Sequence, residues 1–376
     1  MTACPVCGSL DTVTTVQRPL LPVLQNRVYP TRDEALRAPT APFELHTCSI
    51  CGFSFNGRFN SSLVIYDEHY DNDVPSAMFM RYHEELARGL VQRFNLSDGT
   101  VYDVGCGKGT FLEVLCRMAP GIRGIGVDPS CTPKTVGNVT LIKDVFKPEL
   151  VHGDARLVLL RHVLEHIEQP VPFLAAIVVA APRAPIFVEV PDFAWILENG
   201  TFWDFCYEHC NYFTQGSLAH ALMHAGYRVQ EQLSLFAGQF QAIVAAPTKS
   251  QIHREQPTPS SAVQTAREYA LSEGARMRAA RHQIERAGSG AVLWGMATKG
   301  VVFASLMSSM PLAGGIDINL KKQHRFAPGS GLRINPPDWL TSLRRTPTIF
   351  VMNSNYESEI RRHVSALGVL AEFVNL

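Results

Sequence analysis

The sequence has no excess of charge, no long apolar run and no basic, apolar leader. Its 34 lysine and arginine residues balance 34 aspartate and glutamate residues, so no overall attraction favours nucleic acid or an anionic membrane as the main partner. The apolar run at residues 174–181 is far shorter than the roughly 20 residues that cross a bilayer. No signal peptide is recognisable. We therefore expect a soluble, cytoplasmic protein whose partners include neither nucleic acid nor membrane.

Disulfide bonds are not expected either, although the chain has nine cysteines. Five of them are scattered through segments that resemble core elements: Cys106, Cys116, Cys131, Cys206 and Cys210. An odd count in a chain without a secretion signal favours reduced thiols and a metal site.

The other four cysteines form two Cys-x-x-Cys pairs, each followed by glycine: Cys4 with Cys7, and Cys48 with Cys51. Two intervening residues let both thiolates of a tight turn face one ion, and glycine supplies the backbone freedom of that turn. We predict a structural, tetrahedral Zn²⁺ site. Two unrelated cysteine pairs are a weaker alternative, because the spacing and the glycine both recur. Nucleic-acid binding by this region is disfavoured, because it lacks a basic cluster.

The chain is too long for one ordinary core. Changes in composition indicate five segments: a zinc-binding module at 1–60 with a Pro-rich loop between its cysteine pairs, a helical lead-in at 61–97, a central domain at 98–246, a linker and helix at 247–285, and a C-terminal domain at 286–376.

Strand-like and helix-like segments alternate in both larger domains. Central strands are expected at 100–104, 124–128, 139–142, 155–160 and 186–190, followed by an antiparallel hairpin of 227–235 and 239–246 that turns at Gly238. C-terminal strands are expected at 291–294, 315–318 and 348–352, and long helices at 78–94 and 262–286. Such alternation predicts an α/β fold with mostly parallel sheets covered by helices on both faces.

A glycine-rich turn follows the first central strand. The strand ends in Asp103, and the turn reads Gly105-Cys106-Gly107-Lys108-Gly109. Glycines at alternate positions let the backbone pass close to a ligand. A dinucleotide site usually has the wider spacing Gly-x-Gly-x-x-Gly. The tighter spacing suits S-adenosylmethionine, which has no phosphate, and a nicotinamide-binding Rossmann domain is the alternative.

Two acids and one histidine complete the predicted cofactor site. Asp128 ends the second strand, where a carboxylate accepts both ribose hydroxyls. Asp144 follows the third strand and could bind the adenine amine, although a solvated loop acid is equally consistent. His162 follows the fourth strand, in a segment (159–167) that resembles a motif of class I methyltransferases whose backbone borders the cofactor.

Residues 202–214 crowd aromatic side chains around a Glu208-His209 pair, just after the fifth strand. Methylation of carbon requires prior removal of a proton, typically next to a ketone. Histidine is the natural base at neutral pH, a carboxylate can orient it, and a tyrosine hydroxyl can stabilise the enolate oxygen. A buried, non-catalytic histidine in an aromatic core is the alternative.

With these motifs the chain resembles the nucleotide-sugar C-methyltransferases over nearly its whole length. That family joins a zinc module, a class I S-adenosylmethionine-dependent methyltransferase domain and a C-terminal Rossmann-like domain that helps to bind the nucleotide-sugar. The resemblance implies catalytic roles for Tyr70 in segment 66–72, for His166 after the fourth strand, and for Glu208 with His209 as base. The family commonly has a tyrosine two residues before the glutamate, where this chain has Cys206; Tyr207 is the candidate replacement.

The C-terminal segments 293–300, 317–329 and 353–356 resemble the family's glycine turn, acid-to-Pro-Gly run and asparagine-aromatic motif. The resemblance implies these substrate-binding residues: Lys299, Asn319, Lys321, Arg325, Asn353 and Asn355. Lysine and arginine can offset phosphate charge, but solvated surface cations are an equally good interpretation.

The sequence thus predicts a C-methyltransferase for a nucleotide-linked 4-keto-deoxysugar, as a monomer or small homo-oligomer. An oxygen, nitrogen or non-sugar carbon acceptor on the same architecture is the second hypothesis. A non-catalytic binding protein is the third, and the intact glycine loop and Glu-His pair count against it.

Overall fold

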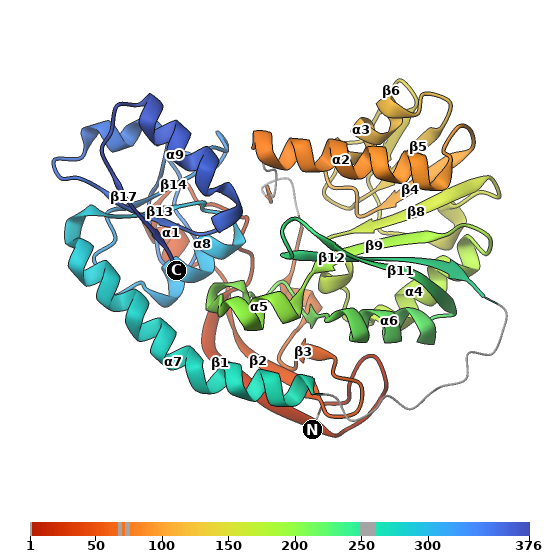
Figure 1. Ribbon diagram of the computed structural model, residues 1–376, viewed down its shortest axis with the longest axis horizontal. Coiled ribbons are helices and arrows are strands. Elements are labelled where there is room, and N and C mark those ends of the chain that lie inside the picture. Colours follow the sequence, from red (N-terminus) through yellow and green to blue (C-terminus); the bar gives the residue numbers. More distant parts are fainter. Residues whose placement is uncertain (1, 67–69, 72–75, 249–260) are drawn as a thin grey trace.

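Three β-sheets, with helices packed on them, organise the chain (Figure 1). The computed structural model describes residues 2–66, 70–71, 76–248 and 261–376. An antiparallel sheet near the N-terminus lies beneath two α/β units, of which the central one is the larger. The predicted fold class, an α/β core flanked by a four-cysteine module and a C-terminal α/β unit, is confirmed.

The central sheet has the strand order β11-β12-β9-β8-β4-β5-β7-β6. Its strands are β4 (Thr100–Val104), β5 (Arg123–Val127), β6 (Lys134–Val136), β7 (Val139–Ile142), β8 (Ala155–Arg161), β9 (Ile186–Pro191), β11 (Tyr227–Leu235) and β12 (Phe240–Pro247). The five strands β4, β5, β7, β8 and β9 run parallel, and the other three are antiparallel to their neighbours.

Neighbouring strand residues face opposite layers of helices, as the pleat requires. Val101 and Leu157 pack with helices α2 (Ala77–Phe94) and α3 (Thr110–Met118). Tyr102 and Val158 face α4 (Pro170–Ala180) and α6 (Gln215–His224) on the other side. The predicted central strands lie within one residue of the observed ones at each end, because each is a short apolar run bounded by turn residues. The hairpin is confirmed, and Gly238 has φ +84° at its turn.

The N-terminal sheet corrects one expectation. The order is β1-β2-β3-β10, formed by β1 (Thr12–Pro22), β2 (Thr40–Cys48), β3 (Ser54–Asn56) and β10 (Asn211–Tyr212). The segment between the cysteine pairs is thus a long antiparallel ribbon with a short helix α1 (Arg32–Leu36). The prediction of a Pro-rich loop in this segment was wrong. Pro19 and Pro42 fall where the register shifts between Arg18 and Leu21, so neither interrupts the regular ladder.

The C-terminal unit has five parallel strands in the order β15-β14-β13-β16-β17. They are β13 (Ala291–Trp294), β14 (Gly314–Ile316), β15 (Ile334–Asn335), β16 (Thr348–Val351) and β17 (Glu372–Asn375), with helices α8 (Thr298–Leu306) and α9 (Glu357–Ala366). The strand predicted to end at 318 stops at Ile316, and β15 and β17 were not predicted. Among the described residues, no helix combines the length and apolar character needed to span a membrane.

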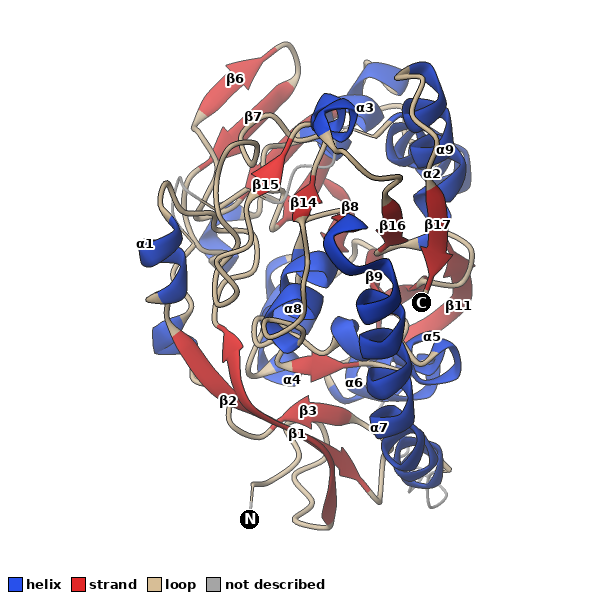
Figure 2. Ribbon diagram, turned by 90° about the vertical axis from the view of Figure 1, so that its left-hand side faces the viewer, coloured by secondary structure: helices blue, strands red, loops and turns tan. Residues whose placement is uncertain are grey.

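The three regions share hydrophobic cores. The buried cysteines of the N-terminal module pack with the inner face of the central sheet and with α4 and α6. The ribbon residues Leu21 and Phe43 belong to a second core that includes α5 (Phe193–Asn199), α7 (Ala262–Ala287) and α8. Helix α7 runs from the N-terminal sheet to the C-terminal unit (Figures 1 and 2). The N-terminal ribbon therefore fixes how the two α/β units meet.

A buried ion pair strengthens this joint. Arg18 of β1 reaches Glu273 of α7 with both terminal nitrogens, one of them 3.0 Å from Oε2. Tyr269 donates a hydrogen bond of 2.8 Å to the same carboxylate. The Arg18 side chain is 6% exposed and that of Glu273 is 10% exposed, so each charge depends on the other for its stabilisation.

We expect Arg18→Ala to lower the free energy of unfolding by about 3–5 kcal/mol, because it leaves the Glu273 carboxylate buried without its cation. Arg281→Ala changes an exposed arginine of the same helix and should cost less than about 0.5 kcal/mol. Urea unfolding compares the two variants. Equal destabilisation would show that the buried pair does not hold the joint.

Candidate active site and metal centre

The glycine loop joins β4 to α3 at the carboxyl edge of the central sheet. Gly105, Gly107 and Gly109 all have positive φ, of +77°, +53° and +81°. A Cβ atom on Gly105 would lie 2.2 Å from Val163, and one on Gly109 would lie 2.8 Å from Leu141. No atom lies within 4 Å of a Cβ built on Gly107. The outer glycines thus allow close packing, whereas the middle one faces open space that a ligand can fill.

Asp128 lies beside this loop, one residue after β5. Its Oδ2 accepts a hydrogen bond from the Gly107 nitrogen at 2.9 Å, and its Oδ1 accepts one from the Ser130 nitrogen at 2.7 Å. Asp103 of β4 pairs with Gly126 of β5. Burial raises the pKa of the Asp103 carboxyl group to about 7. The Cys106 side chain packs against Gly126, and burial raises the pKa of its thiol. The predicted loop and acid are therefore in contact.

The pKa values of Asp144 and His162, the other two predicted cofactor-site residues, are shifted in opposite directions. Asp144 lies two residues after β7, and its pKa is lowered by a hydrogen bond from Lys147 Nζ at 2.7 Å. His162 has φ +54°, and its ring lies 3.2 Å from Glu189 Oε1 and 3.6 Å from Glu165 Oε1. Burial opposes a charged ring, but these carboxylates outweigh it and raise the pKa of His162 to about 9.

Five side chains form what we call the histidine–tyrosine cluster: Tyr66, Tyr70, His166, Glu208 and His209. The His166 and His209 rings are 4.8 Å apart between centroids, edge to face, as are those of Tyr66 and Tyr70. His166 Nδ1 lies 3.0 Å from the Tyr66 hydroxyl and 3.0 Å from the Glu208 carbonyl oxygen. Both tyrosine hydroxyls lie close enough to the Glu208 carboxylate to lower its pKa. Predicted catalytic residues from three distant segments thus lie together.

Strand pairing brings this cluster together. His209 lies two residues before β10, where Asn211 pairs with Phe55 of β3. His166 ends the short turn Leu164–His166 after β8, and the Asn211 amide donates to the Leu164 carbonyl at 2.9 Å. The Gln25 nitrogen, just beyond β1, donates to Glu208 Oε1 at 2.6 Å. The N-terminal sheet therefore positions the segment that carries Glu208 and His209 against the central sheet.

Burial controls the ionisation of the cluster. It raises the pKa of Glu208, which is 1% exposed, although the two tyrosines and the Gln25 nitrogen oppose this. It also raises the pKa of Tyr70, so that hydroxyl keeps its proton. Burial, followed by repulsion from His166, lowers the pKa of His209 to about 3. At neutral pH the His209 ring is therefore neutral, with a lone pair available to accept a proton.

Tyr207 lies apart from the cluster. Its hydroxyl accepts a hydrogen bond from the Asn60 nitrogen at 2.9 Å and donates to the Arg58 carbonyl at 3.3 Å. The ring packs on Phe59 and is fully buried. Cys206 is buried as well. Its backbone nitrogen donates a hydrogen bond to the Tyr212 hydroxyl, which in turn donates one to the Cys206 carbonyl oxygen.

The predicted substrate-binding residues spread over the face that the C-terminal unit turns to the other two. Lys299 contacts Asp204 Oδ2 at 2.7 Å. The amides of Asn353 and Asn355 donate to Gln239 Oε1 at 2.9 and 3.0 Å, which joins the C-terminal unit to the β11–β12 turn. Arg325 is exposed. Within the described residues, five of the six side chains, all except Arg325, make polar contacts with other protein groups.

Asp71 connects the C-terminal unit to the glycine loop. No role for this residue was predicted from the sequence. Its carboxylate contacts Lys108 Nζ at 2.6 Å, Lys321 Nζ at 3.0 Å and the Asn319 amide at 3.0 Å. Its neighbour Tyr70 was the residue predicted from this segment; Asp67, Glu68, His69 and Asn72 of the same motif lie outside the described residues.

Asn26 is a second residue without a sequence signal. Its side chain accepts a hydrogen bond from Lys322 Nζ at 2.8 Å and donates to Thr298 Oγ1 at 3.0 Å and to the Tyr70 hydroxyl at 3.4 Å. Lys322 is 1% exposed. Because its partners are far away in the chain, no local pattern could have revealed Asn26.

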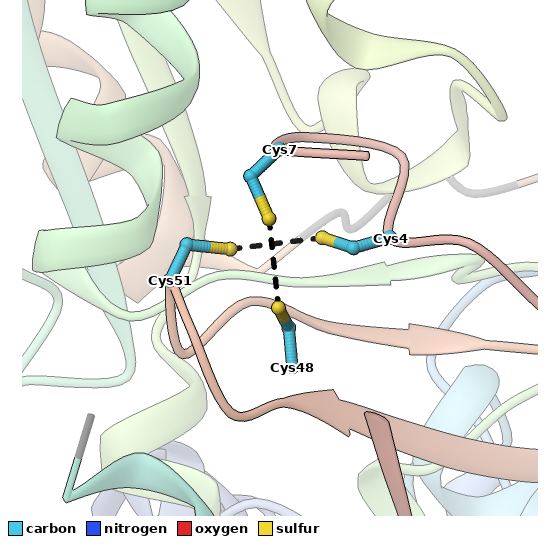
Figure 3. A group of neighbouring side chains, drawn as sticks. All are labelled: Cys4, Cys7, Cys48 and Cys51. Atoms are coloured by element: carbon cyan, nitrogen blue, oxygen red, sulfur yellow. Dashed lines mark hydrogen bonds between the residues drawn. The ribbon is translucent and has the colours of Figure 1, made fainter. Parts of the chain in front are cut away.

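The four predicted metal ligands converge. Figure 3 shows the sulfur atoms of Cys4, Cys7, Cys48 and Cys51 pointing toward one centre from two turns. The Sγ atoms of Cys4 and Cys51 are 3.6 Å apart, and so are those of Cys7 and Cys48. A tetrahedral zinc ion with bonds of about 2.3 Å to sulfur separates its ligands by about 3.8 Å. The residues therefore fit such an ion.

Comparisons with known proteins match the central domain and, for one relative, nearly the whole chain. A family model described as a methyltransferase domain matches residues 78–232. The C-methyltransferase NovU of Streptomyces niveus is 25% identical over 385 residues, which cover 95% of this chain and 90% of that protein.

Two solved structures illustrate the similarity. A SAM-dependent methyltransferase from Aquifex aeolicus is 17% identical, with a TM-score of 0.34, over 46% of this chain and 98% of that one. The magnesium protoporphyrin IX methyltransferase ChlM from Synechocystis PCC 6803, with bound SAH, is 15% identical, with a TM-score of 0.36, over 48% of this chain and 91% of that one.

The domain match includes the glycine loop, Asp128 and the cluster from His166 to His209. The predictions of an enzyme, of a methyltransferase core and of S-adenosylmethionine as methyl donor are thereby confirmed. The chain is an S-adenosylmethionine-dependent methyltransferase with a class I α/β core.

Proposed function

We propose that this methyltransferase methylates carbon next to the ketone of a nucleotide-linked 4-keto-deoxysugar. The observation that carries the proposal is the contact of His166 and His209 beside two half-buried tyrosines, because only a carbon acceptor needs a base and an oxyanion partner together. The relationship to NovU, named a C-methyltransferase, supports the same acceptor atom.

The cofactor is proposed to lie over the glycine loop. Gly105, Cys106, Gly107 and Gly109 would line it, with Asp128 on the ribose hydroxyls, Asp144 near the adenine, and Asp103 and His162 at the edge of the site. The open space at Gly107, next to the Asp128 carboxylate, supports this placement. When bound, S-adenosylmethionine supplies an electrophilic methyl group for an enolate carbon to accept.

His209 is proposed as the base. Its neutral ring can take the proton from the carbon next to the ketone, while the electron pair moves onto the ketone oxygen. Tyr70, held protonated by burial, can then donate a hydrogen bond to that oxygen. His166 lies against His209, and the Glu208 carboxylate lies near the two tyrosines and accepts a hydrogen bond from the Gln25 nitrogen. Tyr207, whose hydroxyl binds Asn60 and Arg58, is the weaker candidate for the oxyanion role.

The C-terminal unit is proposed to bind the nucleotide part of the substrate. Lys321 and Arg325 are exposed cations that can meet a diphosphate. Lys299, Asn319, Asn353 and Asn355 lie on the same face of the unit, where their contacts with Asp204, Asp71 and Gln239 align it with the central sheet.

Zn²⁺ is proposed for the four-cysteine centre, in a structural role. Hydrogen bonding with Cys48, together with burial, raises the pKa of Cys4 to about 12. A bound cation would hold all four groups as thiolates. Because these cysteines pack against α4 and α6, the ion would also brace the sheet that carries β3.

The cofactor site is tested by Gly107→Ala. We expect affinity for S-adenosylmethionine to fall at least about tenfold, because the new methyl group enters the open space and a side chain strains this backbone by about 1–2 kcal/mol. Gly137→Ala is the matched control, since Gly137 also has positive φ and open surroundings, in the β6–β7 turn. Calorimetry should find its affinity unchanged; an equal loss would argue against cofactor at the loop.

The base is tested by solvent deuterium exchange at the carbon next to the ketone, without S-adenosylmethionine. We expect the wild-type chain to exchange deuterium into a nucleotide-linked 4-keto-deoxysugar, and His209→Asn to slow exchange by about 10²–10⁴. Tyr70→Phe should slow it too, whereas Tyr207→Phe should not. Methyl transfer without any exchange would instead indicate an oxygen or nitrogen acceptor.

The metal centre is tested by elemental analysis. We expect one zinc per chain, lost together with thermal stability in Cys48→Ser, because a structural site contributes to folding. Cys116→Ala changes a buried cysteine outside the centre and should keep the zinc. A zinc-free chain that folds normally would contradict the prediction.

A further inference from the structure

A second group of side chains that could bind a metal shares two residues with the histidine–tyrosine cluster. Glu165, His166 and His209 each offer one ligand atom, and these atoms lie within 4.8 Å of one another. The first two come from the turn after β8 and the third from the segment before β10. Strand pairing between the N-terminal and central sheets thus sets the spacing of these ligands.

His166 presents a nitrogen suited to a metal. Its Nδ1 lies 3.0 Å from the Glu208 carbonyl oxygen, which can only accept a hydrogen bond, so Nδ1 carries the proton. The Tyr66 hydroxyl, 3.0 Å from Nδ1, can accept from the same N–H. The lone pair is therefore on Nε2. A histidine whose other nitrogen donates to a carbonyl is the usual arrangement of a metal ligand.

Glu165 supplies a buried carboxylate oxygen that has no partner. The residue is 2% exposed, and its Oε2 makes no hydrogen bond in the described part of the chain. Only Oε1 faces the His162 ring, at 3.6 Å. An unpaired buried carboxylate oxygen is costly, and a cation between it and the two imidazoles would remove that cost.

The ligand set selects the type of ion. Two imidazoles and one carboxylate suit Zn²⁺, Co²⁺ or Ni²⁺, whereas Mg²⁺ and Ca²⁺ prefer sites made of oxygen. Three protein ligands hold an ion less tightly than four thiolates, so binding would be weaker than at the four cysteines and the ion exchangeable.

We propose that Glu165, His166 and His209 form a second, exchangeable site for a late first-row divalent cation, and that an ion bound there inhibits the enzyme. The site itself rests on the ligand geometry. The inhibition rests on the proposed function, because metal ligation and proton abstraction use the same lone pair of His209.

Cobalt titration of the full chain, with zinc already at the cysteines, tests the site without substrate. We expect one further Co²⁺ per chain, with the weak visible bands of nitrogen and oxygen ligands and no thiolate charge-transfer bands. Glu165→Gln should raise its dissociation constant at least about tenfold, and His166→Asn should do the same. Retained zinc and retained binding of S-adenosylmethionine show that both variants are folded.

Two control variants locate the ion. His220 and His224 face each other on α6, with ring centroids 4.3 Å apart, and form a rival pair; His282 is an exposed histidine of α7. His224→Asn and His282→Asn should leave the second cobalt signal unchanged. Loss of the signal in His224→Asn but not in Glu165→Gln would overturn the site, as would uptake of no cobalt beyond the cysteines.

Enzyme assays then test the inhibition. Zn²⁺ should slow deuterium exchange and methyl transfer in the wild-type chain, mild chelation should restore both, and Glu165→Gln should need at least about ten times more Zn²⁺ for the same effect. Metal binding without inhibition would overturn the inhibitory role and count against His209 as base. Absence of binding would overturn the site and leave the proposed function standing.

Discussion

The two-residue strand β10 is the constraint on which the site depends. It pairs with β3 of the N-terminal sheet, and the Asn211 side chain binds the turn after β8 of the central sheet. Glu208 and His209 lie three and two residues before this strand, so their positions follow from the contact between two sheets. The N-terminal module is for this reason part of the framework of the histidine–tyrosine cluster, and its buried cysteines pack into the core beneath the central sheet.

Polar contacts at the centre of the molecule join all three regions around Tyr70 and Asp71. Asn26 comes from the N-terminal ribbon, Lys108 from the cofactor loop, and Lys321 and Lys322 from the C-terminal unit. Charged groups at such a junction are retained at a cost in desolvation. Side chains of all three regions thus meet beside the half-buried Tyr70.

The sequence predicted what depends on local pattern. Short apolar runs located the strands, alternate glycines located the turn between β4 and α3, and doubled spacing located the four cysteines. The ribbon was not predicted because Pro19 and Pro42 argue against regular strands. Both prolines fall at a register shift that the sequence does not reveal. Long-range partners were equally hidden: Glu165 lies near His209, whereas Glu208 turns to Gln25 and the tyrosines. The direction in which the Tyr207 side chain points depends on the path of the backbone into β10. Its position next to Glu208 in the sequence does not reveal that path.

A structure of the full chain with S-adenosylhomocysteine tests the central claim most directly, because that claim joins the glycine loop to the histidine–tyrosine cluster. The account predicts ribose hydroxyls within hydrogen-bonding distance of Asp128 and a sulfur atom that faces His209 across space for a sugar ring. A sulfur atom turned away from the cluster, or a nucleoside bound elsewhere, would contradict it.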